Sequence, residues 1–474
     1  MKTKLRTSGE VSGSWPSRAR GRFPRRSGSS GPVDDVGLSR RGLLQAALVG
    51  AGGVALGGAL SGCATPTASG SGRTSVMIWD LFSGGDGGLM QEMVGAVRAA
   101  NPDLNVDSTT LAWGPPYYTK LAMASSGGRP PEAAVMHLSR LAGYAPGGLL
   151  EPFDLDALAE LGITQEDFPA AVWEKAQFDG QLYALPLDTH PYINFYNPEM
   201  VRQAGLADAD GKLRPLVGAD AFLDAGRDLA EVTGETGMSW GYLRDPAGCW
   251  RVFWGLYSQT GGGYDLTPGK PAELDTAKAE EVFEFLQEML DGEVAAPNQD
   301  GGAATGRFMS ERTGLVFDGE WDLPMFRDAL GDNLGGAPFP TIFDQPANYA
   351  DSHSFVLPRQ ATPDPEARQA TYRVLADLLR ESMTWAQAGH IPAYQPIVQT
   401  PEYQALVPQS DYAKAAEIAV FDPDVWFAGG GSDFQTRIGD SMMDTLSSKA
   451  TPQTAVDRML SEMNRLLSQP DPAA

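Results

Sequence analysis

The feature that most constrains the fold is an alternation of short apolar runs with helix-like segments. Three runs predict strands: residues 75–79, 104–111 and 133–136. A helix over residues 89–101 is indicated by four apolar side chains that share one face: Met90, Met93, Val94 and Val97. A second helix is expected over residues 118–125. This order of strands and helices predicts an α/β fold with a parallel sheet and right-handed crossovers.

The residues that end these strands are suited to a polar ligand. Trp79 and Asp80 end the first strand, Trp113 follows the second, and His137 follows the third. In open α/β sheets, ligands bind beyond the carboxyl ends of the strands. We therefore expect Trp79, Asp80, Trp113 and His137 at a binding site.

The N-terminus has the three parts of an export signal. Residues 1–38 are rich in Arg and Lys, and residues 45–60 form a short apolar stretch of Ala, Gly, Val and Leu. Arg40 and Arg41 lie between them, which resembles a twin-arginine signal. We expect residues 1–62 to be a signal peptide rather than a transmembrane span, which needs about 20 apolar residues.

Cys63 closes this segment in the sequence Leu-Ser-Gly-Cys, which resembles the lipobox of bacterial lipoproteins. The resemblance implies that Cys63 is lipidated and that the protein is held at the outer face of the cell membrane. Residues 63–74 then form a flexible tether. The second cysteine, Cys249, has no intrachain partner once Cys63 is acylated, so we expect it to be a small buried hydrophobe.

Charge and length limit the function and the domain organisation. Residues 1–62 hold 10 of the 36 Lys and Arg and 3 of the 60 Asp and Glu, so the remaining chain has a net charge of −31. Such a surface repels nucleic acid, and we expect no nucleic-acid partner. The 412 residues after position 62 exceed what one hydrophobic core usually serves, so two lobes are expected.

The segment DGQLYALP at residues 179–186 is followed by a strand that ends in Tyr196-Asn197. Four further segments carry short motifs: residues 104–118, 149–153, 308–321 and 389–394. Taken together and in their order along the chain, these motifs resemble those of extracellular solute-binding proteins of carbohydrate ABC importers, the maltose-binding-like group. The resemblance spans residues 75–465.

The resemblance implies two discontinuous lobes with a ligand cleft between them. We expect residues 75–187 and 315–360 in the first lobe, and 188–314 and 361–470 in the second. The chain is expected to cross between lobes near residues 186–190, 314–320 and 357–363. Further helices are predicted over residues 220–232, 272–291, 363–381, 401–419 and 451–467, the last with Thr451 as its N-cap.

The implied function is the capture of a sugar and its delivery to ABC permease subunits by a monomeric, lipid-anchored protein. Sugar sites stack aromatic rings on the C–H faces and place carboxylates and amides around the hydroxyls. The expected ligand-binding residues are Trp79, Asp80, Trp113, His137, Asp188, His190, Trp254, Asp318, Glu320, Trp321 and Tyr394. Trp240 and Trp250 are also candidates. Because Trp250 and Trp254 have helical i, i+4 spacing, a core role is open for both.

Catalytic and metal motifs are absent from the sequence. It contains no GxSxG, HExxH, phosphate loop or paired CxxC motif, and a multi-histidine metal site would need most of the four histidines to converge. We therefore expect no enzyme activity, no cofactor and no metal. Two alternatives are kept: a secreted carbohydrate-active enzyme, whose paired carboxylates need no local motif, and an adhesin-like structural lipoprotein.

Overall fold

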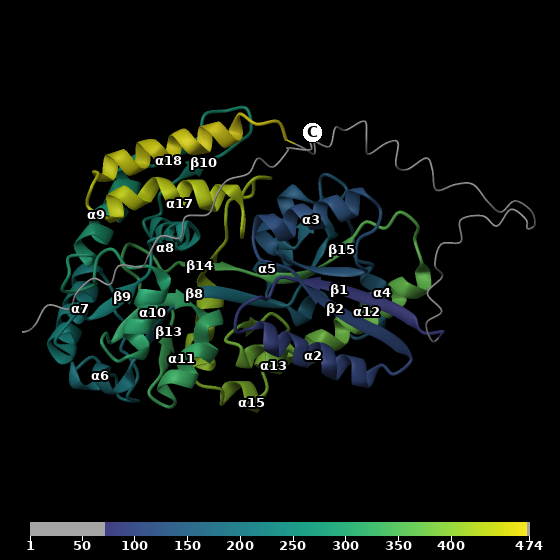
Figure 1. Cartoon of the computed structure of the whole chain (residues 1–474), viewed down its shortest axis with the longest axis horizontal. Helices are drawn as coiled ribbons and strands as arrows, with labels where there is room; N and C mark the ends of the chain where they lie inside the picture. The colour runs from purple at the N-terminus through teal and green to yellow at the C-terminus, as the bar shows by residue number, and fades with distance from the viewer. Residues whose placement is uncertain (1–71, 472–474) are drawn as a thin grey trace, which may run out of the picture. The chain divides into compact units, whose positions relative to one another are not determined.

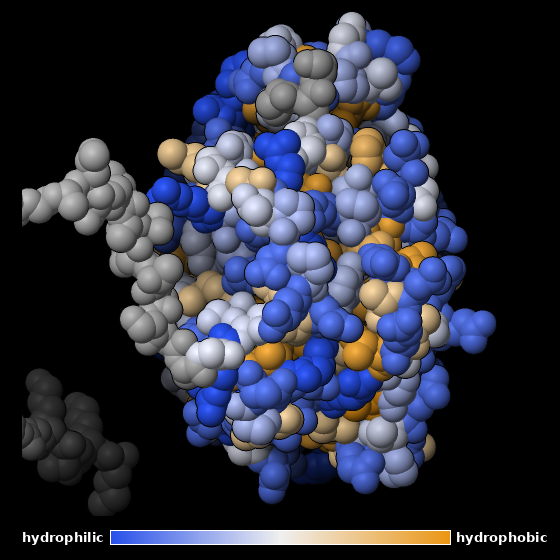
Figure 2. Space-filling model, turned by 90° about the vertical axis from the view of Figure 1, so that its right-hand side faces the viewer, coloured by the Kyte–Doolittle hydropathy of each residue, from blue (hydrophilic) through white to orange (hydrophobic). Residues whose placement is uncertain are grey.

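The computed structural model describes residues 72–471, which form two lobes, each with its own β-sheet and covering helices (Figure 1). The expected signal peptide and the lipidation site Cys63 lie outside the described residues. Within residues 72–471, no helix is both long and apolar enough to cross a membrane. The face shown in Figure 2 is mostly hydrophilic, with small apolar patches scattered among polar residues.

The first lobe contains a six-stranded sheet in the order β2-β1-β3-β15-β4, with β7 also paired to β15. Its strands are β1 (Thr74–Asp80), β2 (Leu104–Thr110), β3 (Ala133–His137), β4 (Leu150–Glu151), β7 (Ala184–Pro186) and β15 (His353–Pro358). β1 is parallel to β2 and β3, as predicted, but β15 is antiparallel to β3, β4 and β7. The sheet is mixed because β15 enters directly from the second lobe instead of through a helical crossover.

Early and late helices together cover the first sheet, as the colours of Figure 1 show. The early ones are α2 (Gly87–Ala100), α3 (Pro115–Ser126), α4 (Leu155–Glu160) and α5 (Ala170–Lys175). The late ones, α12 (Pro365–Arg380) and α13 (Ser382–Gln387), pack against β1 and α2. One hydrophobic core joins all of them, with Met93, Val135 and Leu375 fully buried in it.

The second lobe contains a seven-stranded sheet in the order β17-β14-β8-β12-β9, with β13 and β16 also paired to β8. Its strands are β8 (Asp188–Tyr196), β9 (Met238–Trp240), β12 (Leu315–Gly319), β13 (Gly335–Ala337), β14 (Asn348–Asp351), β16 (Ile391–Pro392) and β17 (Ala419–Val420). All nine residues of β8 are buried, although four of them are Asp188, Thr189, His190 and Asn194. A fully buried strand with this many polar side chains must supply them with partners.

Six helices of the second lobe enclose a larger core. They are α6 (Pro198–Gln203), α7 (Ala219–Thr233), α8 (Pro246–Gln259), α9 (Thr276–Met289), α17 (Asp433–Leu446) and α18 (Pro452–Leu467). Two others, α10 (Gly301–Met309) and α11 (Leu323–Leu330), pack in a separate, smaller core. Thr451 caps α18 by accepting a hydrogen bond from the amide of Thr454, which confirms the predicted cap. Cys249 is fully buried in α8.

The expectation of two discontinuous lobes is confirmed, but their boundaries differ from those predicted. The chain passes between lobes at Leu187, between β7 and β8, and at Ser352, between β14 and β15. After α13 it touches the second sheet at β16, packs again on the first core at α14 (Gln395–Val398), and then stays in the second lobe. β12 therefore lies in the second lobe and α12 in the first, each opposite to the lobe that was predicted for it. No crossing occurs at 314–320 or at 357–363, because β12 stays hydrogen-bonded to β8 and β15 continues into the first lobe.

The prediction of a single helix over residues 401–419 is also wrong. The structure has two single turns instead, α15 (Pro401–Gln404) and α16 (Gln409–Tyr412), followed by a 3-10 segment over Ala413–Ile418. Pro408 lies between the two turns, and a proline inside a helix removes a backbone donor and clashes with the preceding turn.

Candidate functional site

A cavity of about 260 Å³ lies between the two lobes. It is lined by Leu81, Phe82, Ser83, Gly84, Gly85, Asp86, Trp113, His137, His190, Asp245, Ala247, Arg251, Trp321, Asp322 and His353. The first-lobe residues lie at or just after the carboxyl ends of β1, β2 and β3, where an α/β sheet places ligands, except for His353, which begins β15. The second-lobe residues come from β8, from the start of α8 and from the turn after β12.

Each lobe contributes one tryptophan to the cavity. Trp113 follows β2 in the first lobe, and 39% of its surface is exposed. Trp321 follows β12 in the second lobe, where a Cβ on Gly319 would overlap its ring, so glycine is needed for the indole to fold back over the strand. The guanidinium of Arg251 lies over both rings, 5.1 Å from the centre of Trp321 and 5.9 Å from that of Trp113.

The start of α8 brings two charged side chains to the cavity. Asp245 is the N-cap of α8 and accepts a hydrogen bond from the amide of Gly248. Pro246 occupies the first turn, a position that favours proline. Arg251 lies in the second turn of this helix and lines the cavity. The carboxylates that line the same cavity are Asp86, Asp245 and Asp322.

Asp318 and Asp322 form a pair of half-buried carboxyl groups beside the cavity. Burial raises the pKa of Asp322 to about 6. Burial, together with the neighbouring Asp322, raises the pKa of Asp318 well above its usual range. A neighbouring carboxyl group disfavours the ionised form of a carboxylate, so each member of the pair makes the other harder to ionise. Asp322 lines the cavity, whereas Asp318 lies behind it.

Asp188 is the centre of a fully buried hydrogen-bond network at the first inter-lobe crossing. It accepts hydrogen bonds from the backbone amide of His353 (2.8 Å) and from the indole N–H of Trp385 (2.7 Å). Its two oxygens also face Nδ1 of His190 (3.0 Å) and of His353 (2.8 Å). Although burial opposes ionisation, His353 and His190 hold the pKa of Asp188 well below its usual range.

The remaining imidazoles are held from both lobes. His190 stacks on His353, with ring centres 3.9 Å apart. Nδ1 of His137 lies 2.6 Å from the hydroxyl of Tyr118. Burial and the neighbouring His353 lower the pKa of His190 to about 3, so its ring is neutral. His137, His190 and His353 all line the cavity.

Four of the predicted ligand-binding residues, Trp113, His137, His190 and Trp321, line the cavity. Asp80, Asp188 and Asp318 lie behind its wall, and Asp80 accepts a hydrogen bond from the amide of Phe82 in the loop that forms part of it. Glu320 is fully buried and faces His390, and burial raises its pKa to about 8.

Three predicted aromatic residues lie elsewhere. Trp254 is 3% exposed, donates its indole N–H to the carbonyl of Phe421 and stacks on Trp250 in the second core. Tyr394 packs in the first core, near Phe168. Trp79 packs beneath Lys120 on another surface of the first lobe. Their positions depend on which helices cover them. A prediction from strand ends or short motifs does not contain that information.

Five residues with acidic, basic or imidazole side chains line the cavity without having been predicted from the sequence: Asp86, Asp245, Arg251, Asp322 and His353. One signal was available for Arg251, since it interrupts an otherwise apolar run in α8. For His353 the signal was composition alone, because all four histidines of the chain turn out to lie in one neighbourhood. The convergence that a multi-histidine site requires is therefore present.

The family model of bacterial extracellular solute-binding proteins matches residues 92–408. This is more than half of the chain, and the protein belongs to this family. Membership places it among binding proteins rather than enzymes. Among curated proteins, none matches the sequence.

Solved structures with this fold include three sugar receptors. The GacH receptor of Streptomyces glaucescens, solved unliganded and with acarbose, is 18% identical with a TM-score of 0.69, over 84% of this chain and 99% of that one. The maltose-bound MalE3 of T. maritima is 14% identical with a TM-score of 0.67, over 83% and 99%. The cyclic alpha-maltosyl-1,6-maltose binding protein of Arthrobacter globiformis is 18% identical with a TM-score of 0.65, over 84% and 99%. At these identities the likeness establishes the two-lobed fold.

The network around Asp188 predicts a specific stability loss. Trp385→Phe removes a hydrogen bond to a buried carboxylate, which is worth about 1.5–3 kcal/mol. Trp240→Phe is the matched control, because Trp240 is equally buried and its indole N–H has no hydrogen-bond partner among the described residues. We expect Trp385→Phe to be the more destabilising by about that amount in urea unfolding. Equal losses for the two variants would contradict this account of the network.

Proposed function

We propose that this protein binds a sugar in the inter-lobe cavity and delivers it to an ABC importer. The observation that carries the proposal is a cavity with one tryptophan from each lobe and a rim of carboxylate, imidazole and guanidinium groups. A sugar ring has apolar C–H faces that stack on indoles and hydroxyls that need both donors and acceptors. A hydroxyl buried without a partner costs about 1–3 kcal/mol, so the rim would select the ligand.

The size of the cavity favours a small ligand. Sites for drug-sized molecules have volumes of roughly 300–1,000 Å³, and this cavity has about 260 Å³. We therefore propose a ligand of about one sugar ring. Trp113 and Trp321 would cover its faces, while Asp86, Asp245 and Asp322 would bind its hydroxyls.

Binding is proposed to close the two lobes without making or breaking a covalent bond. The lining residues come from both lobes, so a ligand that touches both stabilises the closed state by its higher affinity for that state. The strands that cross between lobes, at Leu187 and Ser352, lie beside the cavity and would bend during closure. Permease subunits would then recognise the closed form.

The proposed location is the outer face of the cell membrane, with Cys63 as the lipid anchor. This part of the proposal rests on the N-terminal sequence: a basic segment, paired arginines, a short apolar stretch and the Leu-Ser-Gly-Cys motif. The family to which the chain belongs is described as extracellular, which agrees with export.

The sugar proposal is tested by thermal denaturation of the purified protein with a panel of mono- and oligosaccharides. A ligand at about 100 times its dissociation constant stabilises the folded state by about 2.7 kcal/mol, and we expect one or more small sugars to give such a shift. A panel in which no sugar shifts the melting temperature, while amino acids do, would overturn the carbohydrate assignment.

Two tryptophan variants then test the site with the best sugar of the panel. Trp321→Ala removes a stacking surface and should weaken binding by about 1–3 kcal/mol with little loss of stability. Trp254→Ala is the control, because its side chain is in the second core. It should cost about 3–5 kcal/mol of stability and leave the affinity of the folded protein unchanged. The opposite pattern would show that Trp321 is a core residue.

Lipid anchoring is tested by phase partition in detergent. The full chain expressed in an exporting bacterium should enter the detergent phase, and Cys63→Ser should move it to the aqueous phase because the acylated sulfur is lost. Cys249→Ser is the control, since Cys249 is buried in α8, and it should still enter the detergent phase. Detergent partition of Cys63→Ser equal to that of the unchanged protein would rule out Cys63 as the anchor.

A further inference from the structure

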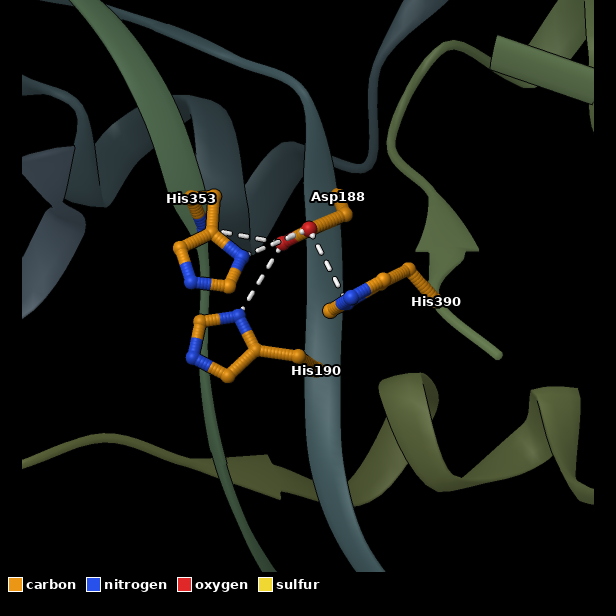
Figure 3. A group of neighbouring side chains, drawn as sticks. All are labelled: Asp188, His190, His353 and His390. Carbon is orange, nitrogen blue, oxygen red and sulfur yellow. Dashed lines mark hydrogen bonds and ion pairs between the residues drawn. The ribbon is translucent and has the colours of Figure 1, made fainter. Parts of the chain in front are cut away.

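Four side chains around Asp188 bring their potential metal-ligating atoms close together. Asp188, His190, His353 and His390 each offer one ligand atom, and these atoms all lie within 4.8 Å of one another. All four side chains are buried, with 0–5% of each residue exposed. Figure 3 shows the three imidazoles arranged around the Asp188 carboxylate.

The cluster is assembled from three separate parts of the chain. Asp188 and His190 are two residues apart in β8, so their side chains lie on the same face of the strand. His353 begins β15, immediately after the crossing at Ser352. His390 precedes β16 and is held by Trp385, whose ring stacks on it with centres 4.1 Å apart and an interplanar angle of 3°. The rigid surroundings fix all four side chains in place.

The spacing of the donor atoms matches that of metal ligands. Asp188 oxygens lie 3.0 Å from Nδ1 of His190, 2.8 Å from Nδ1 of His353 and 3.3 Å from Nδ1 of His390. Ligands about 2.0–2.1 Å from a zinc ion are separated by roughly 2.9–3.4 Å in octahedral or tetrahedral geometry. A metal ion could replace the hydrogen between Asp188 and each imidazole, with the four ligand atoms, which lie within 4.8 Å of one another, drawing together around it.

Buried polar atoms beside the cluster lack hydrogen-bond partners. Among the described residues, neither ring nitrogen of His390 and neither carboxylate oxygen of Glu320 makes a hydrogen bond of acceptable geometry, although both residues are fully buried. His390 Nδ1 and Glu320 Oε1 are 2.9 Å apart, within ion-pair distance. Native proteins leave few buried polar groups without partners, and a bound ion is one explanation of those that occur.

We infer that Asp188, His190, His353 and His390 form a binding site for a divalent transition-metal ion, with Glu320 beside it. Imidazole and carboxylate ligands suit zinc and its first-row neighbours, whereas calcium and magnesium prefer oxygen ligands alone. Two of the four residues, His190 and His353, also line the cavity, so the ion would lie next to the bound solute. The inference concerns the cluster itself and does not rest on the sugar proposal.

The test is calorimetric titration of the purified, chelator-treated protein with zinc chloride, followed by visible absorption of the cobalt(II) form. We expect one tightly bound ion per chain and a cobalt spectrum that indicates nitrogen ligands. His190→Gln and His353→Gln should each weaken zinc binding by more than the roughly 10–100-fold that loss of an outer-shell partner costs. His137→Gln is the matched control: it alters a histidine in the same cavity but outside the four, so zinc affinity should be retained.

Several outcomes would overturn the inference. The first is that the unchanged protein shows no saturable zinc binding, and the second is that it shows several weak sites of the kind that surface carboxylates provide. The third is that the His190 and His353 variants bind zinc with the same affinity as the unchanged protein. The cobalt spectrum of the unchanged protein decides the question even if a variant fails to fold, since a spectrum with oxygen ligands only would exclude the three imidazoles. Sugar binding without metal binding would leave the sugar proposal standing and refute this one.

Discussion

The burial of the Asp188 carboxylate is the constraint on which the junction of the two lobes depends. A carboxylate removed from water is tolerated only when it is paired and hydrogen-bonded. Here the partners come from both sides of the junction: from the first lobe, the amide and imidazole of His353 at the start of β15 and the indole of Trp385 in α13, and from the second lobe, the imidazole of His190 in β8. Loss of one partner would leave an uncompensated charge, so these segments must stay together.

This requirement explains why the crossing strands are so polar and still buried. Asp188 and His190 begin β8, Asp351 ends β14, and His353 begins β15. Asp351 accepts hydrogen bonds from the amide and, at short range, the hydroxyl of Ser139. The polar side chains thus satisfy one another across the junction, and the ones that face the cavity are already oriented before a ligand arrives. Such preorganisation reduces the ordering cost of binding.

Local patterns were enough to predict much of the first lobe. β1, β2, β3 and α2 follow from apolar runs and helical spacing that need no knowledge of the rest of the chain. The family resemblance correctly predicted two discontinuous lobes. The assignment of β12 and α12 to lobes was wrong. Strand pairing and helix packing depend on contacts between residues far apart in the sequence, and neither periodicity nor short motifs report such contacts.

In the candidate site, too, some residues could be predicted from local sequence and others could not. Trp113, His137, His190 and Trp321 could be named in advance because they follow strand ends or family-like motifs. His353 could not be predicted, because it reaches the cavity only through the pairing of β15 with β3. Arg251 could not be predicted either, because its position depends on the direction of α8. Trp254 and Tyr394 were misplaced because composition does not tell which of many aromatic residues fill a core.

The most direct test of the account is small-angle X-ray scattering of the protein with and without the sugar that stabilises it most. Closure of two lobes around a ligand held between them brings their centres of mass together. The account predicts a smaller radius of gyration at saturating sugar, and no such change with a sugar that gives no thermal shift. Superimposable scattering profiles with and without the bound sugar would contradict capture by lobe closure.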